Sequence, residues 1–148
     1  MKKLATLLCA TLLSLPMLAA DSTWGTDLPS ALAQAKKENK MVLMDFTGSD
    51  WCGWCKKLDK EVFSTPEFTE YAKKNLVLVE VDFPASRNQT ADLKKANAAL
   101  KVKYGAEGFP TIVVVGAEGK QLWKQVGYMP GGPKAWIAKL DDAKKKVK

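Results

Sequence analysis

Two apolar runs of strand length, residues 41–46 and 76–81, lie far apart in the chain and are separated by segments of helical periodicity. Such runs suit strands buried on both faces, and strands that are joined through helices lie parallel in one sheet. Residues 111–115 and 121–126 are two later strand-like runs on either side of a turn at Gly119, which predicts an antiparallel hairpin. The chain is therefore predicted to have an α/β fold, with a central mixed sheet flanked by helices and a C-terminal hairpin followed by a helix.

The helices are predicted from apolar spacing together with start and stop signals. They cover residues 27–39, 52–62, 66–74, 90–104 and a final segment that opens at residues 131–133. The chain of 148 residues contains no internal repeat and no linker, so one domain is expected.

The first 20 residues are predicted to be a signal peptide. Met1-Lys2-Lys3 is a short basic start, residues 4–15 are apolar, and Ala19-Ala20 offers a cleavage site. We expect cleavage after Ala20, which leaves residues 21–148 as a single domain. The protein would then be exported, and either periplasmic or secreted.

Two alternatives for this N-terminal stretch are less favoured. A membrane anchor needs a longer apolar run than residues 4–15 provide. A lipid-anchored Cys9 would follow Leu8, which is bulky where such sites take a small residue. No other apolar stretch is long enough to cross a bilayer, so we expect no stable membrane insertion.

The charge of the chain indicates no particular partner. The formal net charge of +7 falls to +5 when Lys2 and Lys3 leave with the signal peptide. Part of the excess is the lysine-rich C-terminus, residues 144–148, and cations suit the end of a helix. A basic patch can bind nucleic acid, but we interpret this one as a solvated helix end and predict no nucleic-acid partner.

The cysteine count is more informative. Cys9 would leave with the signal peptide, so only Cys52 and Cys55 remain, and the chain has no histidine. The lack of histidine excludes Ser-His-Asp and Cys-His nucleophile pairs and the usual zinc enzymes, and two thiolates are half of a structural zinc site, so no metal is predicted. A disulfide across so short a loop would restrict the unfolded chain by only about 2 kcal/mol, which favours a redox role over a stabilising one.

The two-residue spacing at a helix start suits thiol–disulfide exchange. Cys52 would lie where unpaired N–H groups and the helix dipole favour a thiolate. Cys55 follows nearly one turn later, where we expect it to be more buried and to release the mixed disulfide. Gly53 would allow close approach of a partner chain. Trp51 and Trp54 would form an apolar rim, with core packing as the alternative.

Three motifs resemble the thioredoxin superfamily. Residues 44–46 with residues 51–56 resemble its active-site strand, loop and helix. Residues 108–111, Gly-Phe-Pro-Thr, resemble the family's cis-proline loop, and residues 125–127 resemble the glycine after its last strand. The match spans about residues 27–146. The form Asp-Trp-Cys-Gly-Trp-Cys-Lys-Lys is similar to that of secreted, single-domain bacterial thioredoxin-like proteins.

The resemblance implies a thioredoxin-like fold and a role for each matched position. Cys52 would be the attacking thiolate and Cys55 the resolving thiol, and Asp45 would be the buried acid that accepts the proton of Cys55. Pro110, in a cis peptide bond, would lie against the cysteines and help to seat a substrate strand. The full set of implied substrate-binding residues is Trp51, Gly53, Trp54, Phe109, Pro110 and Gly127.

The sequence departs from the family pattern at three places. The loop from Asp45 to Cys52 is one residue longer, and Trp54 stands where members carry proline, histidine or tyrosine. The chain also has no match for the lysine that the family places near the buried acid.

We predict a thiol–disulfide oxidoreductase that exchanges a dithiol or disulfide with protein substrates through Cys52 and Cys55. It would act as a monomeric reductant in the cell envelope and be recycled by a membrane or soluble electron-transfer partner, with its own disulfide as the redox centre and no other cofactor. The same chemistry could instead run in the oxidant or isomerase direction. Further alternatives are a redox-inert chaperone or binding module with Trp51, Trp54, Phe109 and Tyr128 as its apolar patch, and a peroxidase in which Cys52 forms a sulfenic acid.

Overall fold

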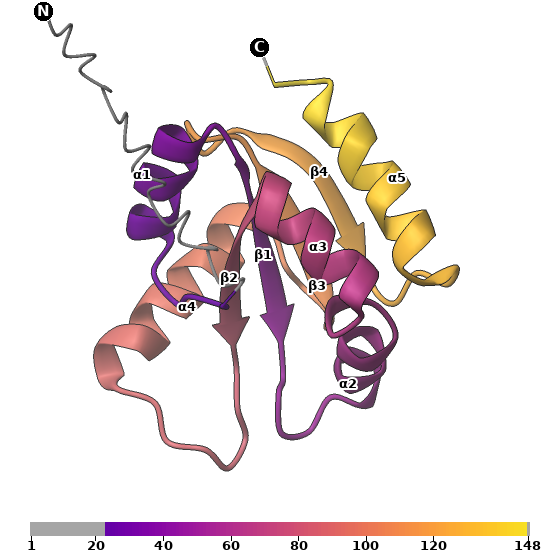
Figure 1. Cartoon of the computed structure of the whole chain (residues 1–148). Helices are drawn as coiled ribbons and strands as arrows, with labels where there is room; N and C mark the ends of the chain where they lie inside the picture. Colours follow the sequence, from indigo (N-terminus) through magenta and orange to yellow (C-terminus); the bar gives the residue numbers. More distant parts are fainter. Residues whose placement is uncertain (1–22, 148) are drawn as a thin grey trace, which may run out of the picture.

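The computed structural model describes residues 23–147 (Figure 1). The predicted signal peptide, residues 1–20, lies outside the described residues. Within residues 23–147, no helix combines the length and the apolar character that a membrane span requires.

A four-stranded mixed sheet in the order β2-β1-β3-β4 forms the centre of the molecule. β1 (Met41–Thr47) pairs in parallel with β2 (Leu76–Asp82), and β3 (Thr111–Val115) runs antiparallel both to β1 and to β4 (Gln121–Val126). All residues of β1 are buried, as expected for a strand covered on both faces. The parallel crossover, the late hairpin and the mixed sheet are therefore confirmed.

Helices cover both faces of this sheet (Figure 1). The helical segments are α1 (Leu28–Glu38), α2 (Gly53–Leu58), η1 (Asp59–Phe63), α3 (Pro66–Asn75), α4 (Ala91–Tyr104) and α5 (Gly132–Lys144). Because successive strand residues point to opposite faces, the core divides into two clusters. Leu43 belongs to the cluster with α2, η1, α3 and α5, and Met44 to the cluster with α1 and α4.

Local capping explains why the predicted helices begin and end where they do. The side chains of Asp27, Thr65 and Thr90 each accept a hydrogen bond from a backbone N–H in the first turn of α1, α3 and α4. Gly105 ends α4 in the left-handed conformation, with φ of 60°. On α4, Ala96 is exposed and Asn97 is buried, so a polar residue lies on the inward face of this helix.

The helix predicted over residues 52–62 consists of two segments. After α2 the backbone widens into the π-helix η1, in which the N–H of Ser64 donates to the carbonyl oxygen of Asp59 at 2.8 Å. The wider turn places both Val62 and Phe63 in the core next to Leu58. Apolar spacing alone does not distinguish this arrangement from a regular α-helix.

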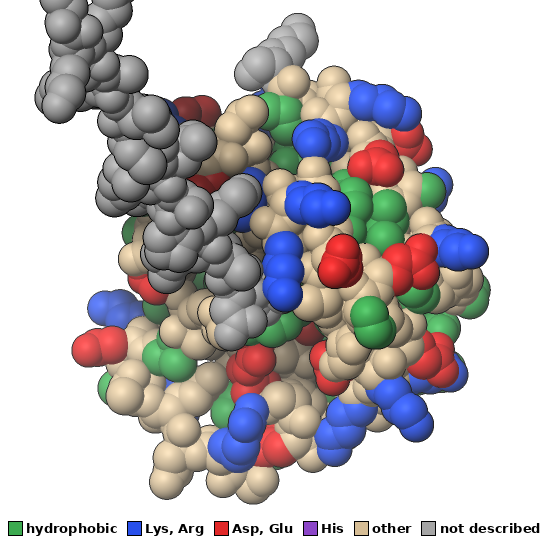
Figure 2. Space-filling view, viewed as in Figure 1, with side chains coloured by type: hydrophobic (Ala, Val, Ile, Leu, Met, Phe, Trp, Pro, Cys, Tyr) green, Lys and Arg blue, Asp and Glu red, His purple; other side chains and the backbone are tan. Residues whose placement is uncertain are grey.

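The surface carries charges of both signs. On the face seen in Figure 2, Lys and Arg side chains are interspersed with Asp and Glu side chains. Only a few large apolar side chains among the described residues are exposed, and two of them, Trp51 and Trp54, are sequence neighbours of the cysteines.

Candidate active site

The cysteine pair lies at the start of α2. Cys52 is the N-cap residue, and its Sγ accepts a hydrogen bond from the N–H of Cys55 at 3.2 Å. The two residues form a disulfide. Cys52 is 6% exposed and Cys55 is 4% exposed, so the expected contrast in burial is slight in the disulfide form. The N–H of Cys55 is nevertheless directed at Cys52, where it would stabilise a thiolate.

Trp51 and Trp54, the two tryptophans of the predicted apolar rim, are both exposed. Trp51 is 51% exposed and Trp54 is 59% exposed, so core packing, the alternative considered for both, is wrong. The indole of Trp51 meets the ring of Phe109 edge to face at a centroid distance of 5.6 Å, and the indole of Trp54 lies 5.5 Å from the ring of Tyr128. These contacts hold in place two exposed indoles that belong to sequence neighbours of the cysteines.

The loop before β3 contains the proline that the sequence singled out. The Phe109–Pro110 peptide bond is cis, as the resemblance implied. The N–H of Gly127 donates to the carbonyl oxygen of Pro110 at 2.8 Å, and Gly127 has a φ of 76° that favours glycine. Gly127 therefore fixes this loop from the end of β4.

A cavity of about 330 Å³ lies behind the disulfide and is lined by both Asp45 and Cys55. Asp45 is buried, and its Oδ1 has no hydrogen-bond partner among the described residues. Burial raises the pKa of Asp45 well above its ordinary value, and the nearby carboxyl groups of Glu80, Asp59 and Asp82 raise it further. The acid predicted from the resemblance thus lines the same cavity as the second cysteine and has a strong tendency to hold a proton.

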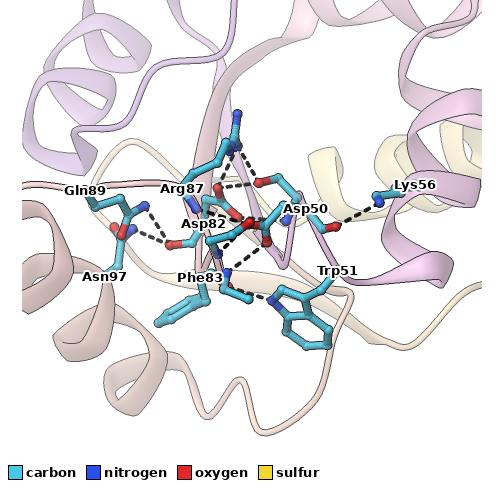
Figure 3. A network of polar contacts seen from close by, with 11 residues as sticks. Asp50, Trp51, Lys56, Asp82, Phe83, Arg87, Gln89 and Asn97 are labelled. Carbon is cyan, nitrogen blue, oxygen red and sulfur yellow. Dashed lines mark hydrogen bonds and ion pairs between the residues drawn. The ribbon is translucent and has the colours of Figure 1, made fainter.

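Asp50, which belongs to none of the sequence motifs, anchors the loop that follows β2 (Figure 3). Its carboxylate accepts hydrogen bonds from the N–H groups of Ala85 at 2.9 Å, Ser86 at 2.7 Å and Arg87 at 3.2 Å, and from the hydroxyl of Ser86 at 2.7 Å. These donors hold the pKa of Asp50 far below its ordinary value. We refer to this arrangement as the Asp50 clamp.

Two further interactions join the same segments. Asp82 at the end of β2 accepts hydrogen bonds from the N–H and the hydroxyl of Ser49, at 2.9 and 2.6 Å, and its Oδ2 lies 2.9 Å from a guanidinium nitrogen of Arg87. The indole N–H of Trp51 donates to the carbonyl oxygen of Phe83 at 2.8 Å (Figure 3). The residue directly before Cys52 is thereby fixed to the loop after β2.

The signal for this network in the sequence was weak. Gly48, Ser49 and Asp50 are residue types that bond to nearby backbone groups in turns. Nothing in the order of the residues indicates that Asp50 bonds instead to residues 85–87, which are more than 30 positions away.

The ammonium groups of the two lysines after Cys55 both have partners within the protein. The ammonium group of Lys56 donates to the backbone carbonyl of Asp50 at 3.0 Å. Lys57 forms an ion pair with Glu61 at 2.5 Å, and Glu61 also accepts a hydrogen bond from the hydroxyl of Tyr128. The carboxylate of Glu61 raises the pKa of Lys57. These contacts join the first turns of the helix to Tyr128, and so to Trp54.

The site combines a Cys-x-x-Cys disulfide at a helix start, a cis-proline loop directly before β3 and a buried acid on the cavity behind the second cysteine. A dithiol that alternates with a disulfide needs no metal and no organic cofactor to transfer two electrons. The fold and the site together define a thiol–disulfide oxidoreductase.

The chain belongs to the thioredoxin-like domain family, whose model matches residues 28–144. It is 39% identical over 130 residues to the disulfide bond reductase DsbH of Chlamydia pneumoniae, covering 88% of this chain and 77% of that protein. It is 36% identical over 131 residues to the thioredoxin-related protein DsbJ of the same organism. That match covers 37% of the length of DsbJ.

Solved structures confirm the predicted thioredoxin-like fold. A DsbH oxidoreductase is 37% identical and superposes with a TM-score of 0.79 over 96% of this chain and 95% of that one. A thioredoxin from Thermus thermophilus, at 21% identity and a TM-score of 0.59 over 81% of this chain and 85% of that one, shares the fold alone.

Proposed function

We propose that this protein works in the reducing direction, as a disulfide bond reductase for proteins outside the cytoplasm. The observation that carries this proposal is the similarity to a disulfide bond reductase over 88% of the chain, together with a matching structure over 96% of it. The arrangement of the cysteines, the cis-proline loop and the buried acid supplies the residues that such a reaction needs.

The reaction assigns a separate role to each cysteine. The Cys52 thiolate attacks a substrate disulfide, forms a new S–S bond to one substrate sulfur and releases the other as a thiolate, which takes a proton from water. Cys55 then passes its proton to the Asp45 carboxylate, and its thiolate attacks Cys52 Sγ. The second substrate sulfur leaves as a thiolate, so the substrate gains two electrons and the protein is left with the Cys52–Cys55 disulfide.

The substrate chain would lie across the aromatic rim. Trp51 and Trp54 offer exposed apolar faces, and the loop at Phe109 and Pro110 would seat an extended segment beside the disulfide. At Gly53 a Cβ atom would meet no other group within 4 Å, so this part of the surface is open to a partner. Gly127 contributes through its hydrogen bond to the proline loop.

The cellular setting of the proposal rests on the sequence. The basic, apolar and small-residue order of residues 1–20 supports export to the periplasm or beyond. In that setting the oxidised protein needs an electron-transfer partner, in the membrane or in solution, that reduces Cys52–Cys55 again. We propose that the protein acts as a monomer on protein thiols and disulfides.

The direction of electron flow is tested by the reduction potential of the Cys52–Cys55 couple, titrated against a dithiothreitol or glutathione buffer. Trp51 and Trp54 flank the disulfide and would report its state by fluorescence. A potential near about −270 mV supports a reductant, whereas a potential between about −120 and −180 mV would overturn the proposed direction in favour of an oxidant or isomerase.

The role of Cys52 is tested by Cys52→Ser in an assay of protein disulfide reduction. The variant should have no activity, while Val102→Ser, at an exposed position of α4, should keep it. Full activity of Cys52→Ser would refute the proposed mechanism.

A further inference from the structure

Asp45 has a second carboxyl group as its neighbour in the sheet. In the parallel pairing of β1 with β2, the register partner of Asp45 is Glu80. Register partners point to the same face, and adjacent strands lie about 4.8 Å apart. Both residues also line the cavity behind Cys55. The two carboxyl groups therefore face the same cavity from neighbouring strands.

The N-terminal segment keeps Glu80 from full contact with solvent. The N–H of Glu80 donates to the carbonyl oxygen of Gly25 at 2.8 Å, and the N–H of Gly25 donates to the carbonyl oxygen of Leu78 at 2.9 Å. This short pairing along β2 places Trp24 at the cavity, where it packs against Phe63 at a centroid distance of 5.3 Å. Glu80 is half-buried as a result.

The other charged groups around the cavity do not neutralise the pair. Asp59 from η1 and Asp82 from β2 add negative charge. Of the cations that line the cavity, Lys56 is hydrogen-bonded to the Asp50 carbonyl and Arg87 is paired with Asp82.

The two carboxyl groups differ in their surroundings. Burial and the charges of Asp82 and Asp59 raise the pKa of Glu80, and Arg87 offsets part of that rise. Asp45 is the more deeply buried of the two, and its Oδ1 has no partner among the described residues. Glu80 therefore ionises first, and its charge then opposes ionisation of Asp45.

We propose that Asp45 and Glu80 form an electrostatically coupled carboxyl pair, in which the charge on Glu80 sets the pH at which Asp45 becomes free to take the proton of Cys55. Glu80 acts through Asp45, so it is a positioning residue for that proton rather than a catalytic one. The inference rests on the proposed role of Asp45 as the acceptor for Cys55. In the step concerned, the proton moves from Cys55 Sγ to the Asp45 carboxylate, the Cys55–Cys52 bond forms and the bond from Cys52 to the substrate sulfur breaks.

The kinetic test uses dithionitrobenzoate with the reduced full-length protein, because each cysteine releases one thionitrobenzoate in turn. The first release reports attack by Cys52, and the second reports attack by Cys55 on the mixed disulfide. In Glu80→Gln, the pH midpoint of the second release should shift down by about one unit, while the midpoint of the first release stays unchanged. A purely structural role of Glu80 would change the rates without moving that midpoint.

Two variants serve as controls. Glu80→Asp keeps the charge and should keep the wild-type midpoint, and Glu70→Gln, at an exposed position of α3 away from the cavity, should leave both releases unchanged. An equal shift in Glu80→Asp and Glu80→Gln would overturn the proposal, because it would mean that side-chain shape and not charge sets the midpoint.

A titration of the oxidised protein tests the pair independently of activity. The carboxyl carbon of Asp45, followed by NMR, should titrate at lower pH in Glu80→Gln than in the wild type. Coincident titrations in the two proteins would refute the pair even if the protein is a reductase. If Asp45→Asn instead left the second release unchanged, the proposed acceptor role of Asp45 would fail, and with it the control of Cys55 by Glu80.

Discussion

The indole ring of Trp51 lies against Gly48 so closely that a Cβ atom at residue 48 would be 2.3 Å from ring carbon Cε2. The loop between Asp45 and Cys52, one residue longer than the family pattern, thus includes a glycine that leaves room for the tryptophan to fold back over it. In that position the indole can donate to the carbonyl oxygen of Phe83 and meet the ring of Phe109 beside the cis proline. The orientation of the rim next to Cys52 depends on the missing side chain at residue 48.

Gly48→Ala should therefore displace Trp51. The methyl group would collide with a ring and not with the end of a flexible chain, so we expect a loss of about 1–3 kcal/mol in the free energy of unfolding. Urea denaturation measures the loss, and a shift in tryptophan emission would report the displaced indole. Gly53→Ala is the matched control for stability, because a Cβ there meets no other group within 4 Å. Wild-type stability and emission in Gly48→Ala would show that the contact does not constrain Trp51.

The Asp50 clamp should matter for activity, although Asp50 does not lie on the cavity behind the disulfide. Asp50→Ala removes the acceptor of the Ala85 and Ser86 N–H groups. The loop that carries the Phe83 carbonyl would then be freed, and Trp51 with it. We expect disulfide reduction to slow on the order of tenfold, since small displacements of reacting groups are costly. Faster amide hydrogen exchange at residues 85 and 86 would confirm the cause.

The pH dependence of the clamp has a definite sign. The pKa of Asp50 is lowered in the folded protein, so its contribution to stability is present above the ordinary aspartate value of 3.8 and is lost as the pH falls through the folded value. The stability advantage of the wild type over Asp50→Ala in urea denaturation should be full at neutral pH and should shrink as the pH falls from 3.8 toward the folded value. Asp142→Ala, on the exposed surface of α5, should leave the rate of reduction unchanged; an equal loss of rate there would speak against the clamp.

The parts of the fold that depend on local sequence could be predicted. Strand runs are set by apolar patterning, and the starts of α1, α3 and α4 by capping side chains three residues before the N–H group they accept from. The cysteine pair and the cis proline were predicted because short motifs carry them. The π-helical turn after Leu58 was not, because it changes the hydrogen-bond pattern without changing which residues are apolar.

The contacts around the cysteines could not be predicted from sequence patterns. Asp50 meets residues 85–87, and Asp45 faces Glu80, only because β1 and β2 pair in one particular register. A shift of that register by one residue would turn Glu80 to the other face of the sheet. In the sequence, Glu80 is a polar residue near the end of an apolar run, and nothing local separates it from a solvent-facing strand residue.

Asp45→Asn should stabilise the protein at neutral pH. The pKa of Asp45 is raised in the folded state, so stability falls as the pH rises from the ordinary value of 3.8 through the folded value. The asparagine variant does not carry this cost. Its stability relative to the wild type should therefore rise with pH above 3.8. Urea denaturation of the oxidised proteins at several pH values measures the difference, and a difference that does not depend on pH would contradict the raised pKa of Asp45.

Cys55→Ser should trap substrates. Without the resolving thiol, the mixed disulfide on Cys52 has no internal attacker and persists until an external thiol arrives. Incubation of the reduced variant with a disulfide-bonded protein should yield a covalent complex on a non-reducing gel. Added reductant should cleave the mixed disulfide and release the two proteins. Cys52→Ser should form none. Equal trapping by both single variants would mean that either cysteine can attack, and would refute the order assigned here.

Substitution of Trp54 should weaken binding of a protein substrate without slowing the exchange chemistry. Its indole is 59% exposed and packs against Tyr128, which Glu61 holds in turn. Trp54→Ala would remove apolar contact area without disturbing the core, so we expect KM for a protein disulfide to rise about tenfold, as at the central aromatic residues of interfaces, with little change in kcat. The rate with dithionitrobenzoate, which is too small to reach across the rim, should stay near the wild-type value. Trp54→Phe keeps an apolar ring, so its KM for the protein disulfide should lie between the values of the wild type and Trp54→Ala. Equal losses with the small and the protein disulfide would instead assign Trp54 to the exchange step.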